Sequence, residues 1–238
     1  MKEANIKLGK SGEILGQKRN DSFFKSIDTP DKAYILGFLY ADGCVQKDGK
    51  YVRLTLAEYD KEILEKIKIA MRIEVNLNLL KARNKNQANQ YQLTLCRAEG
   101  AKYLIEHGCT PHKTFDIRFP NWLSDKLMPH FIRGYFDGDG SITSQTAKKA
   151  SINFCSNPIF IQEAQKYLNE KLNIKTYVSR PQNSNISYLC FGNKEAKSKF
   201  MEYIYKNADL YMERKYQCYL YWKNRNYQQL SKKETRQC

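Results

Sequence analysis

One apolar segment occurs twice in this chain of 238 residues. Residues 35–43 read ILGFLYADG, and residues 132–140, which lie 97 positions later, read IRGYFDGDG. Each copy is typical of an apolar helical turn with small residues at its third and seventh places and an Asp-Gly end. A repeat of this kind predicts two similar half-domains with two equivalent carboxylates, Asp42 and Asp139.

The small residues in each copy predict a close contact between two helices. Residues four apart share one helix face, so Gly37 with Ala41 and Gly134 with Gly138 form two narrow stripes. Small residues at this spacing let two helix backbones approach closely. A glycine inside a helix costs roughly 1 kcal/mol of stability relative to alanine. The presence of this unfavourable residue in both copies indicates that close helix packing requires it. We therefore expect the helices to cross about a pseudo-twofold axis with their carboxylates together.

The paired carboxylates predict a metal site. Two neighbouring carboxylates at helix C-termini repel each other and the partial negative charge of the helix ends. Mg²⁺ relieves this and favours one or two carboxylates together with phosphate oxygens and water. We expect Asp42 and Asp139 to hold two or more Mg²⁺ ions beside Gly43 and Gly140, which also suit the left-handed residue that often ends a helix. The alternative, an ordinary polar helix cap at each Asp, is disfavoured by the duplication.

The two segments resemble the motifs of the LAGLIDADG homing endonucleases, specifically of the single-chain type that carries both motifs. Each copy has the glycine, the hydrophobic run and the terminal Asp-Gly, and the resemblance covers residues 28–225. The departures are mild: Tyr40 takes the sixth place of the first motif, where Asp137 keeps the acid that is frequent in the family. The resemblance implies an α+β fold of two pseudo-symmetric αββαββα halves, with the motif helices at the interface and a saddle-shaped DNA-binding sheet surface.

The order of the expected elements agrees with two halves. We expect an N-terminal arm at residues 1–27, a first half-domain at 28–125 and a second at 126–238. In the first half we expect a helix from Asp28 through the motif, a strand at 51–56, a helix at 59–72, strands at 76–83 and 90–96, and a helix at 98–107. The second half repeats this order with strands at 141–145 and 150–156, a helix at 157–172, strands at 174–180 and 186–191, and helices at 195–205 and 209–224.

The polar faces and tips of these strands are candidates for contact with DNA. Arginine, lysine, asparagine and glutamine suit base edges in the major groove, which admits a two-stranded ribbon. The candidate DNA-binding residues are Arg53, Lys81, Arg83, Lys85, Gln90, Gln92, Asn153, Arg180 and Gln182. Each of these residues, taken alone, is equally well explained as a solvent-exposed strand residue with no role in binding. The family resemblance favours DNA contact for the set as a whole.

The resemblance also points to catalytic basic residues just after the last helix of each half. Lys113 and Lys215 are the choices there, and Arg118 and Arg214 are the runners-up. Such a side chain orients water or offsets charge on the phosphate. Because the chain has 40 lysines and arginines, plain contact with phosphate is an equally good interpretation.

The composition fits a nucleic-acid binder. The net charge is +15 and the isoelectric point is about 9.4, which is typical of proteins that bind polyanions. No apolar run is long enough for a transmembrane helix and no signal peptide is visible. We expect a monomer with no membrane partner, cytoplasmic and associated with the nucleoid, or in an organelle. Seven scattered cysteines predict reduced thiols and no zinc site or disulfide framework, and three histidines without metal-binding spacing predict no catalytic histidine.

The resemblance and the paired acids together imply a site-specific double-stranded DNA endonuclease. Such an enzyme hydrolyses phosphodiester bonds with Mg²⁺ and leaves 3′ overhangs. The alternative is a non-catalytic nucleic-acid binder on the same scaffold, either a splicing maturase with an intron RNA as partner or a transcription regulator. Retention of both Asp residues favours the nuclease. An excised intein domain is disfavoured, because there is no terminal His-Asn pair and no N-terminal Cys or Ser.

Overall fold

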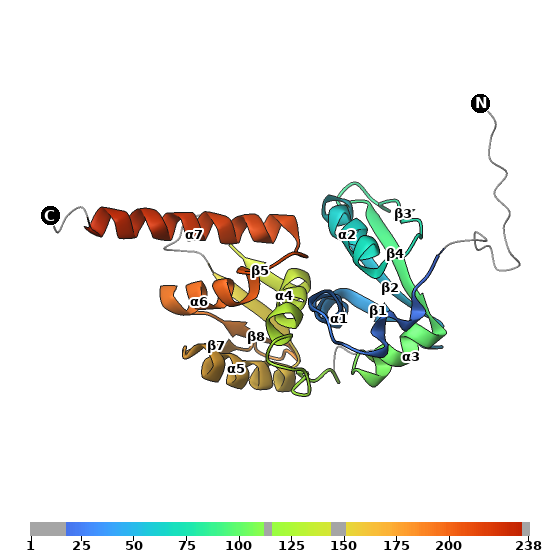
Figure 1. Cartoon of the computed structure of the whole chain (residues 1–238), viewed down its shortest axis with the longest axis horizontal. Coiled ribbons are helices and arrows are strands. Elements are labelled where there is room, and N and C mark those ends of the chain that lie inside the picture. Colours follow the sequence, from blue (N-terminus) through green and yellow to red (C-terminus); the bar gives the residue numbers. More distant parts are fainter. Residues whose placement is uncertain (1–17, 112–115, 144–150, 235–238) are drawn as a thin grey trace, which may run out of the picture.

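The computed structural model describes residues 18–111, 116–143 and 151–234, with side chains up to residue 224. Two halves follow one another along the chain (Figure 1). The first contains η1 (Asp21–Lys25), α1 (Pro30–Asp42), β1 (Gly43–Val45), β2 (Tyr51–Ala57), η2 (Glu58–Asp60), α2 (Lys61–Met71), β3 (Asn78–Leu80), β4 (Gln90–Arg97) and α3 (Ala98–Glu106). The second contains α4 (Met128–Asp139), β5 (Gly140–Ile142), β6 (Ile152–Ser156), α5 (Pro158–Leu172), β7 (Tyr177–Ser179), β8 (Ser187–Cys190), α6 (Lys194–Tyr205) and α7 (Glu213–Glu234).

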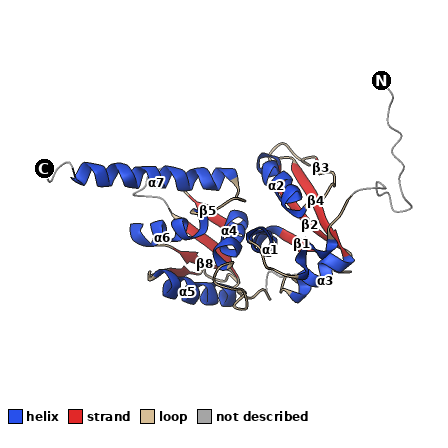
Figure 2. Cartoon of the chain, viewed as in Figure 1, coloured by secondary structure: helices blue, strands red, loops and turns tan. Residues whose placement is uncertain are grey.

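Each half is built on a four-stranded antiparallel sheet. The strand orders are β1-β2-β4-β3 and β5-β6-β8-β7, so the two sheets have the same topology. The motif helices α1 and α4 lie side by side between them, and the remaining helices lie farther out (Figure 2). The predicted α+β fold with two pseudo-symmetric halves is therefore confirmed.

The helix starts follow from local capping chemistry. The side chain of Thr29 accepts a hydrogen bond from the backbone N–H of Lys32 at the start of α1, and Pro30 occupies the first turn. Asn157 caps α5 in the same way and is followed by Pro158. A polar N-cap satisfies backbone donors that have no partner in the helix, and proline in the first turn loses no hydrogen bond.

The strands of the first sheet bury one face and leave the other open. In β2, Val52, Leu54 and Leu56 are buried, while Arg53 and Thr55 are partly exposed on the opposite face. This alternation follows from the period of two in a strand. The helices α1, α2 and α3 all contact β2, and the alternating burial leaves the opposite face of the strand partly exposed.

The strands expected over 76–83 and 174–180 are much shorter in the structure. β3 spans only Asn78–Leu80, because Leu80 already pairs with Gln90, the first residue of β4, and no strand residue remains to pair with residues 81–83. There the side chain of Asn89 accepts a hydrogen bond from the backbone N–H of Ala82. β7 spans only Tyr177–Ser179, and the strand predicted over 174–180 is too long at both ends.

The last helix begins later and ends later than expected. The prediction over 209–224 is wrong at both ends, since α7 spans Glu213–Glu234. Residues before Glu213 make other bonds: the carbonyl of Leu210 accepts from the Arg133 guanidinium, and the N–H of Met212 donates to the Asp137 carboxylate. Their backbone is therefore committed to contacts with α4.

Within residues 18–27, two aromatic side chains anchor the chain to the first half. Phe23 and Phe24 lie in η1 and are buried, and η1 packs against α3. The imidazole of His107 contacts the Phe24 carbonyl at 2.9 Å. The boundaries of the arm and of the half-domains stay predictions.

Candidate functional site

The two motif helices touch through their backbones. A Cβ atom added at Gly37 would lie 2.0 Å from the carbonyl oxygen of Phe131 in α4. A Cβ atom at Gly134 would lie 1.9 Å from the carbonyl oxygen of Tyr34 in α1. Both distances are far below van der Waals contact, so only glycine permits this crossing. The stripes expected from the sequence therefore face each other.

The same crossing brings the ends of the helices together. A Cβ atom at Gly138 would lie 2.4 Å from the Ala41 Cβ and 3.0 Å from the Oδ2 atom of Asp42. The Asp42 carboxylate thus lies against the last turn of α4, next to Asp139. Both acids raise the pKa of the Cys155 thiol, after burial as the main cause, to about 11. The structure therefore gathers Asp42, which is exposed, and Asp139, which is half-buried, at one site.

The donor set at this site fits a divalent cation that also has ligands from outside the chain. Among residues 18–111, 116–143 and 151–224, no three His, Cys, Asp or Glu side chains are grouped closely enough to hold a metal. Two carboxylates remain, at the ends of two helices. Mg²⁺ favours one or two carboxylates and takes its other oxygens from water and phosphate. Asp42 and Asp139 match that preference.

Gly43 and Gly140 follow the acids but do not adopt the conformation expected of them. Their φ angles are −70° and −79°, which is extended and not left-handed. A strand begins directly at each glycine, so the backbone must extend at once. Glycine is required here for space, because a Cβ atom would lie 2.5 Å from the Leu39 carbonyl oxygen at Gly43 and 2.3 Å from the Phe136 carbonyl oxygen at Gly140.

Lys215 lies beneath the end of α4. Its ammonium is buried and donates to the carbonyl oxygens of Phe136 at 2.6 Å, Asp137 at 2.7 Å and Gly138 at 3.3 Å. These carbonyls carry the negative end of the helix dipole, which a cation stabilises. Burial lowers the pKa of Lys215 to about 8, against the opposing effect of nearby carboxylates.

The depressed pKa of Lys215 predicts a rise in stability at alkaline pH. Between about pH 8 and its ordinary value of 10.5 the folded protein binds fewer protons than the unfolded chain. The free energy of unfolding therefore rises with pH in that window, by about 2 kcal/mol between about pH 7.5 and 9.5. Urea denaturation at both pH values should show this rise in the parent protein and not in Lys215→Met. Lys102→Met, at an exposed lysine of α3, should keep the rise, and its loss there would contradict the assignment.

The sequence did not reveal the role of Asp137, which organises a buried polar network. Its carboxylate accepts hydrogen bonds from the hydroxyl groups of Tyr34 at 2.8 Å and Tyr205 at 2.5 Å, and from the backbone N–H of Met212 at 2.8 Å. Burial raises the pKa of Asp137 despite these donors. At the equivalent place in α1, the hydroxyl of Tyr40 donates to the carbonyl of His107. Tyr40 thus links α1 to the residue after α3, and Asp137 links α4 to α6 and to the residues before α7.

The other basic candidates have different surroundings. Arg214 binds the Asp60 carboxylate, with Nε 2.8 Å from Oδ1 and Nη2 3.1 Å from Oδ2. Arg118 is exposed. Lys113 lies outside the described residues. The structure therefore places Lys215 near the paired acids and directs Arg214 toward the other half.

The candidate DNA-binding residues lie on the open sheet faces and at the hairpin tips. On the first sheet Arg53 pairs with Thr94 and Thr55 with Gln92, whose amide donates to the Thr55 hydroxyl at 3.1 Å. On the second sheet Asn153 pairs with Ser141. The remaining candidates, all exposed, lie at the start of β4 and in the loops beyond β3 and β7: Lys81, Arg83, Lys85, Gln90, Arg180 and Gln182. Both halves therefore carry polar and basic side chains on partly or fully exposed strand positions and loops.

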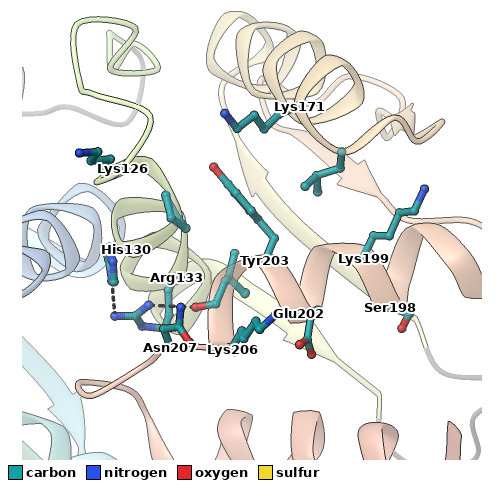
Figure 3. A pocket seen from close by; sticks show the side chains of 13 residues that line it. Lys126, His130, Arg133, Lys171, Ser198, Lys199, Glu202, Tyr203, Lys206 and Asn207 are labelled. Atoms are coloured by element: carbon teal, nitrogen blue, oxygen red, sulfur yellow. Dashed lines mark hydrogen bonds between the residues drawn. The ribbon is translucent and has the colours of Figure 1, made fainter.

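A separate cavity of about 620 Å³ opens between α4, α5 and α6. Figure 3 shows its lysines around the opening and Arg133 with His130 at one side. The buried Arg133 guanidinium donates to the carbonyls of Leu210 and Ile204 and contacts the His130 imidazole. Burial, followed by the Arg133 charge, lowers the pKa of His130 to about 4. Arg133 therefore stabilises the fold here, and the paired acids do not line this cavity.

The six cysteines within the described residues are free. In that part of the chain, no helix combines the length and the apolar character needed to cross a membrane.

Comparison with known proteins points to one family. A family model described as a LAGLIDADG-like domain matches residues 29–107 and again residues 127–205. Uncharacterized protein MJ0398 of Methanocaldococcus jannaschii is 25% identical over 186 residues, covering 74% of this chain. The match spans 63% of that relative's length.

Several solved structures share the fold. The meganuclease I-SmaMI bound to uncleaveable DNA has a TM-score of 0.53 at 15% identity, covering 81% of this chain and 88% of that chain. Variants of the homing endonuclease I-DmoI have a TM-score of 0.50 at 12% identity, covering 80% and 99%. Full-length DUF199/WhiA from Thermatoga maritima has a TM-score of 0.51 at 14% identity, covering 91% and 72%.

Proposed function

The chain belongs to the LAGLIDADG-like domain family through both of its halves, and we propose that it is a site-specific endonuclease of double-stranded DNA. The observation that carries the proposal is the pairing of Asp42 with Asp139 at the ends of α1 and α4. One chain supplies both acids, so we propose that it acts as a monomer.

In this proposal the two acids hold divalent metal ions, with Mg²⁺ as the natural choice. Two ions at such a site would activate water and stabilise the leaving oxygen of a phosphodiester. The Asp42 and Asp139 carboxylates would hold the ions, beside Gly43 and Gly140. Lys215 offsets the negative end of α4 beneath the acids. Lys113 and Lys215 stay our choices for the catalytic basic residues.

The two sheets supply the duplex-binding surface. The net charge of +15 favours a polyanion, and the open faces present side chains that suit base edges, including Arg53, Gln92 and Asn153. With one sheet face from each half in contact with the duplex, the protein would cover a long DNA site. We propose that the cuts are staggered and leave 3′ overhangs, as the family resemblance implies.

The exposed tip residues predict a change in salt dependence. Lys81→Ala and Arg83→Ala should each lower the slope of log affinity against log salt concentration by about 1, because each removes one phosphate contact and its released counterion. Fluorescence anisotropy with a labelled duplex at several salt concentrations measures the slope. Lys102→Ala, at an exposed lysine of α3 on the helical side of the same half, is the matched control and should leave the slope unchanged. Equal slopes in all variants would exclude these tips from the interface.

The test of the nuclease is selection from a randomised duplex library. With Mg²⁺, sequencing of the cut ends should return one long preferred site with 3′ overhangs of constant length. Ca²⁺ in place of Mg²⁺ should allow binding and suppress cleavage. Specific binding without any cleavage in Mg²⁺ or Mn²⁺ would contradict the proposal.

A non-catalytic binder on the same scaffold is the second candidate. The packing of α1 on α4 needs the glycines and not the acids, so the fold is compatible with either function. The partner would then be an intron RNA, for a splicing maturase, or a promoter, for a transcription regulator. Retention of Asp42 and Asp139 favours the nuclease, and a splicing assay with a candidate intron RNA distinguishes the maturase.

A further inference from the structure

Each half holds a segment of the other half against its middle helix. The segment that comes from the second half is residues 209–215, which include the first residues of α7; the segment that comes from the first half is residues 116–125, which precede α4. The start of α7 faces α2 across the interface (Figure 1). The connector before α4 lies against α5. The two halves therefore exchange contacts in both directions.

The first half holds the second through charged groups. The buried Asp60 carboxylate, just before α2, takes both of its hydrogen bonds from Arg214, at 2.8 and 3.1 Å. Six residues later, in α2, the Lys66 ammonium donates to the Tyr211 carbonyl at 3.4 Å and lies 3.5 Å from the Glu213 carboxylate. The pair of Arg214 with Asp60 is bidentate, so it fixes the relative orientation of the two side chains in addition to neutralising their charges.

The second half holds the first through two side chains that bond backbone groups of the connector. Asn157, which lies 97 positions after Asp60, donates to the carbonyl of Ile117 at 2.9 Å. Glu163, which lies 97 positions after Lys66, accepts from the backbone N–H of Phe119 at 3.0 Å. The same two places therefore act in both halves, but at these two places only the first half forms ion pairs with the segment that it holds.

We propose that Asp60 is a positioning residue for Lys215, so that a carboxylate of the first half fixes a basic group of the second. Lys215 directly follows Arg214 at the start of α7, and its ammonium reaches three carbonyls at the end of α4. The bidentate bond to Asp60 fixes the first turn of α7. The ammonium of Lys215 is thereby held under the paired acids.

What Lys215 contributes there rests on the proposed function, but its position is independent of DNA and metal. The measurement is therefore covalent labelling of lysines in the free protein, by reductive methylation followed by peptide mass spectrometry. A buried ammonium with three acceptors reacts slowly, and local opening of its helix exposes it. In Asp60→Asn we expect labelling of Lys215 to rise about tenfold relative to the parent protein.

Three further variants make the result specific. Asp60→Glu keeps a bidentate carboxylate and should restore most of the protection. Arg214→Lys keeps the charge and loses the planar fork, so it should raise labelling of Lys215 even if Asp60→Asn folds poorly. Asp125→Asn is the matched control, because it breaks another cross-half ion pair, with Lys171 at 2.6 Å, at a different contact. It should leave Lys215 protected.

Unchanged labelling of Lys215 in both Asp60→Asn and Arg214→Lys would overturn the proposal, as would an equal rise in Asp125→Asn. Circular dichroism and thermal unfolding identify variants that are globally unfolded. Cleavage is measured separately. Increased labelling in a protein whose parent form cuts no DNA would support the positioning role and contradict the proposed nuclease.

Discussion

Asp42→Asn and Asp139→Asn are each expected to lower the rate of double-strand cleavage by about a thousandfold or more. Each change keeps the shape and removes the charge that attracts a divalent cation. DNA affinity should stay within about threefold, because the loss of one negative charge from a basic protein does not weaken attraction to phosphate. Single-turnover cleavage of the selected duplex in Mg²⁺ measures the rate, and anisotropy in Ca²⁺ measures the affinity.

The matched control for these two variants is Asp48→Asn. Asp48 is exposed in the turn after β1, where it pairs with Lys50 and not with the motif helices. The control removes the same charge and should cut at the parental rate. Undiminished double-strand cleavage by the protein carrying both Asp42→Asn and Asp139→Asn would contradict the proposed site.

Gly134→Ala is expected to destabilise the protein by about 3 kcal/mol or more. The new methyl group would lie 1.9 Å from the Tyr34 carbonyl oxygen, so the backbones of α1 and α4 must separate. Alanine is otherwise the better helix former by about 1 kcal/mol, so the sign of the change is diagnostic. Urea denaturation measures the free energy of unfolding.

Gly192→Ala is the matched control for this effect. Gly192 is exposed, and a Cβ atom there would lie 3.4 Å from the Tyr177 ring, which is ordinary contact. This variant should unfold within about 0.5 kcal/mol of the parent protein. Equal stability of Gly134→Ala and Gly192→Ala would show that the helices do not cross through the glycines.

The elements that depend on local sequence were predicted well. The repeat located both motif helices, and Thr29 and Asn157 marked helix starts because capping involves neighbours in the chain. The alternation of residues 51–56 predicted β2 and its open face. The small residues at four-residue spacing predicted the crossing of α1 and α4, since steric fit follows directly from the absence of a side chain.

The features that were missed involve partners far apart in the sequence. Asp60 and Arg214 are separated by 154 positions, and Asp137 takes its donors from α1, α6 and the segment before α7. No local pattern indicates which buried acid meets which tyrosine. The left-handed conformation expected for Gly43 and Gly140 was wrong for a different reason: each glycine is itself the first residue of a strand, so its backbone is extended.

The contact between Gly37 and Gly134 also determines how freely the rest of the protein can change. Main-chain atoms, whose radii no substitution alters, fix the distance between the two motif helices. Side chains on the sheets can therefore be exchanged without moving Asp42 relative to Asp139. Under the proposed function, such a chain can acquire a new recognition sequence while the stagger between its two cuts stays constant.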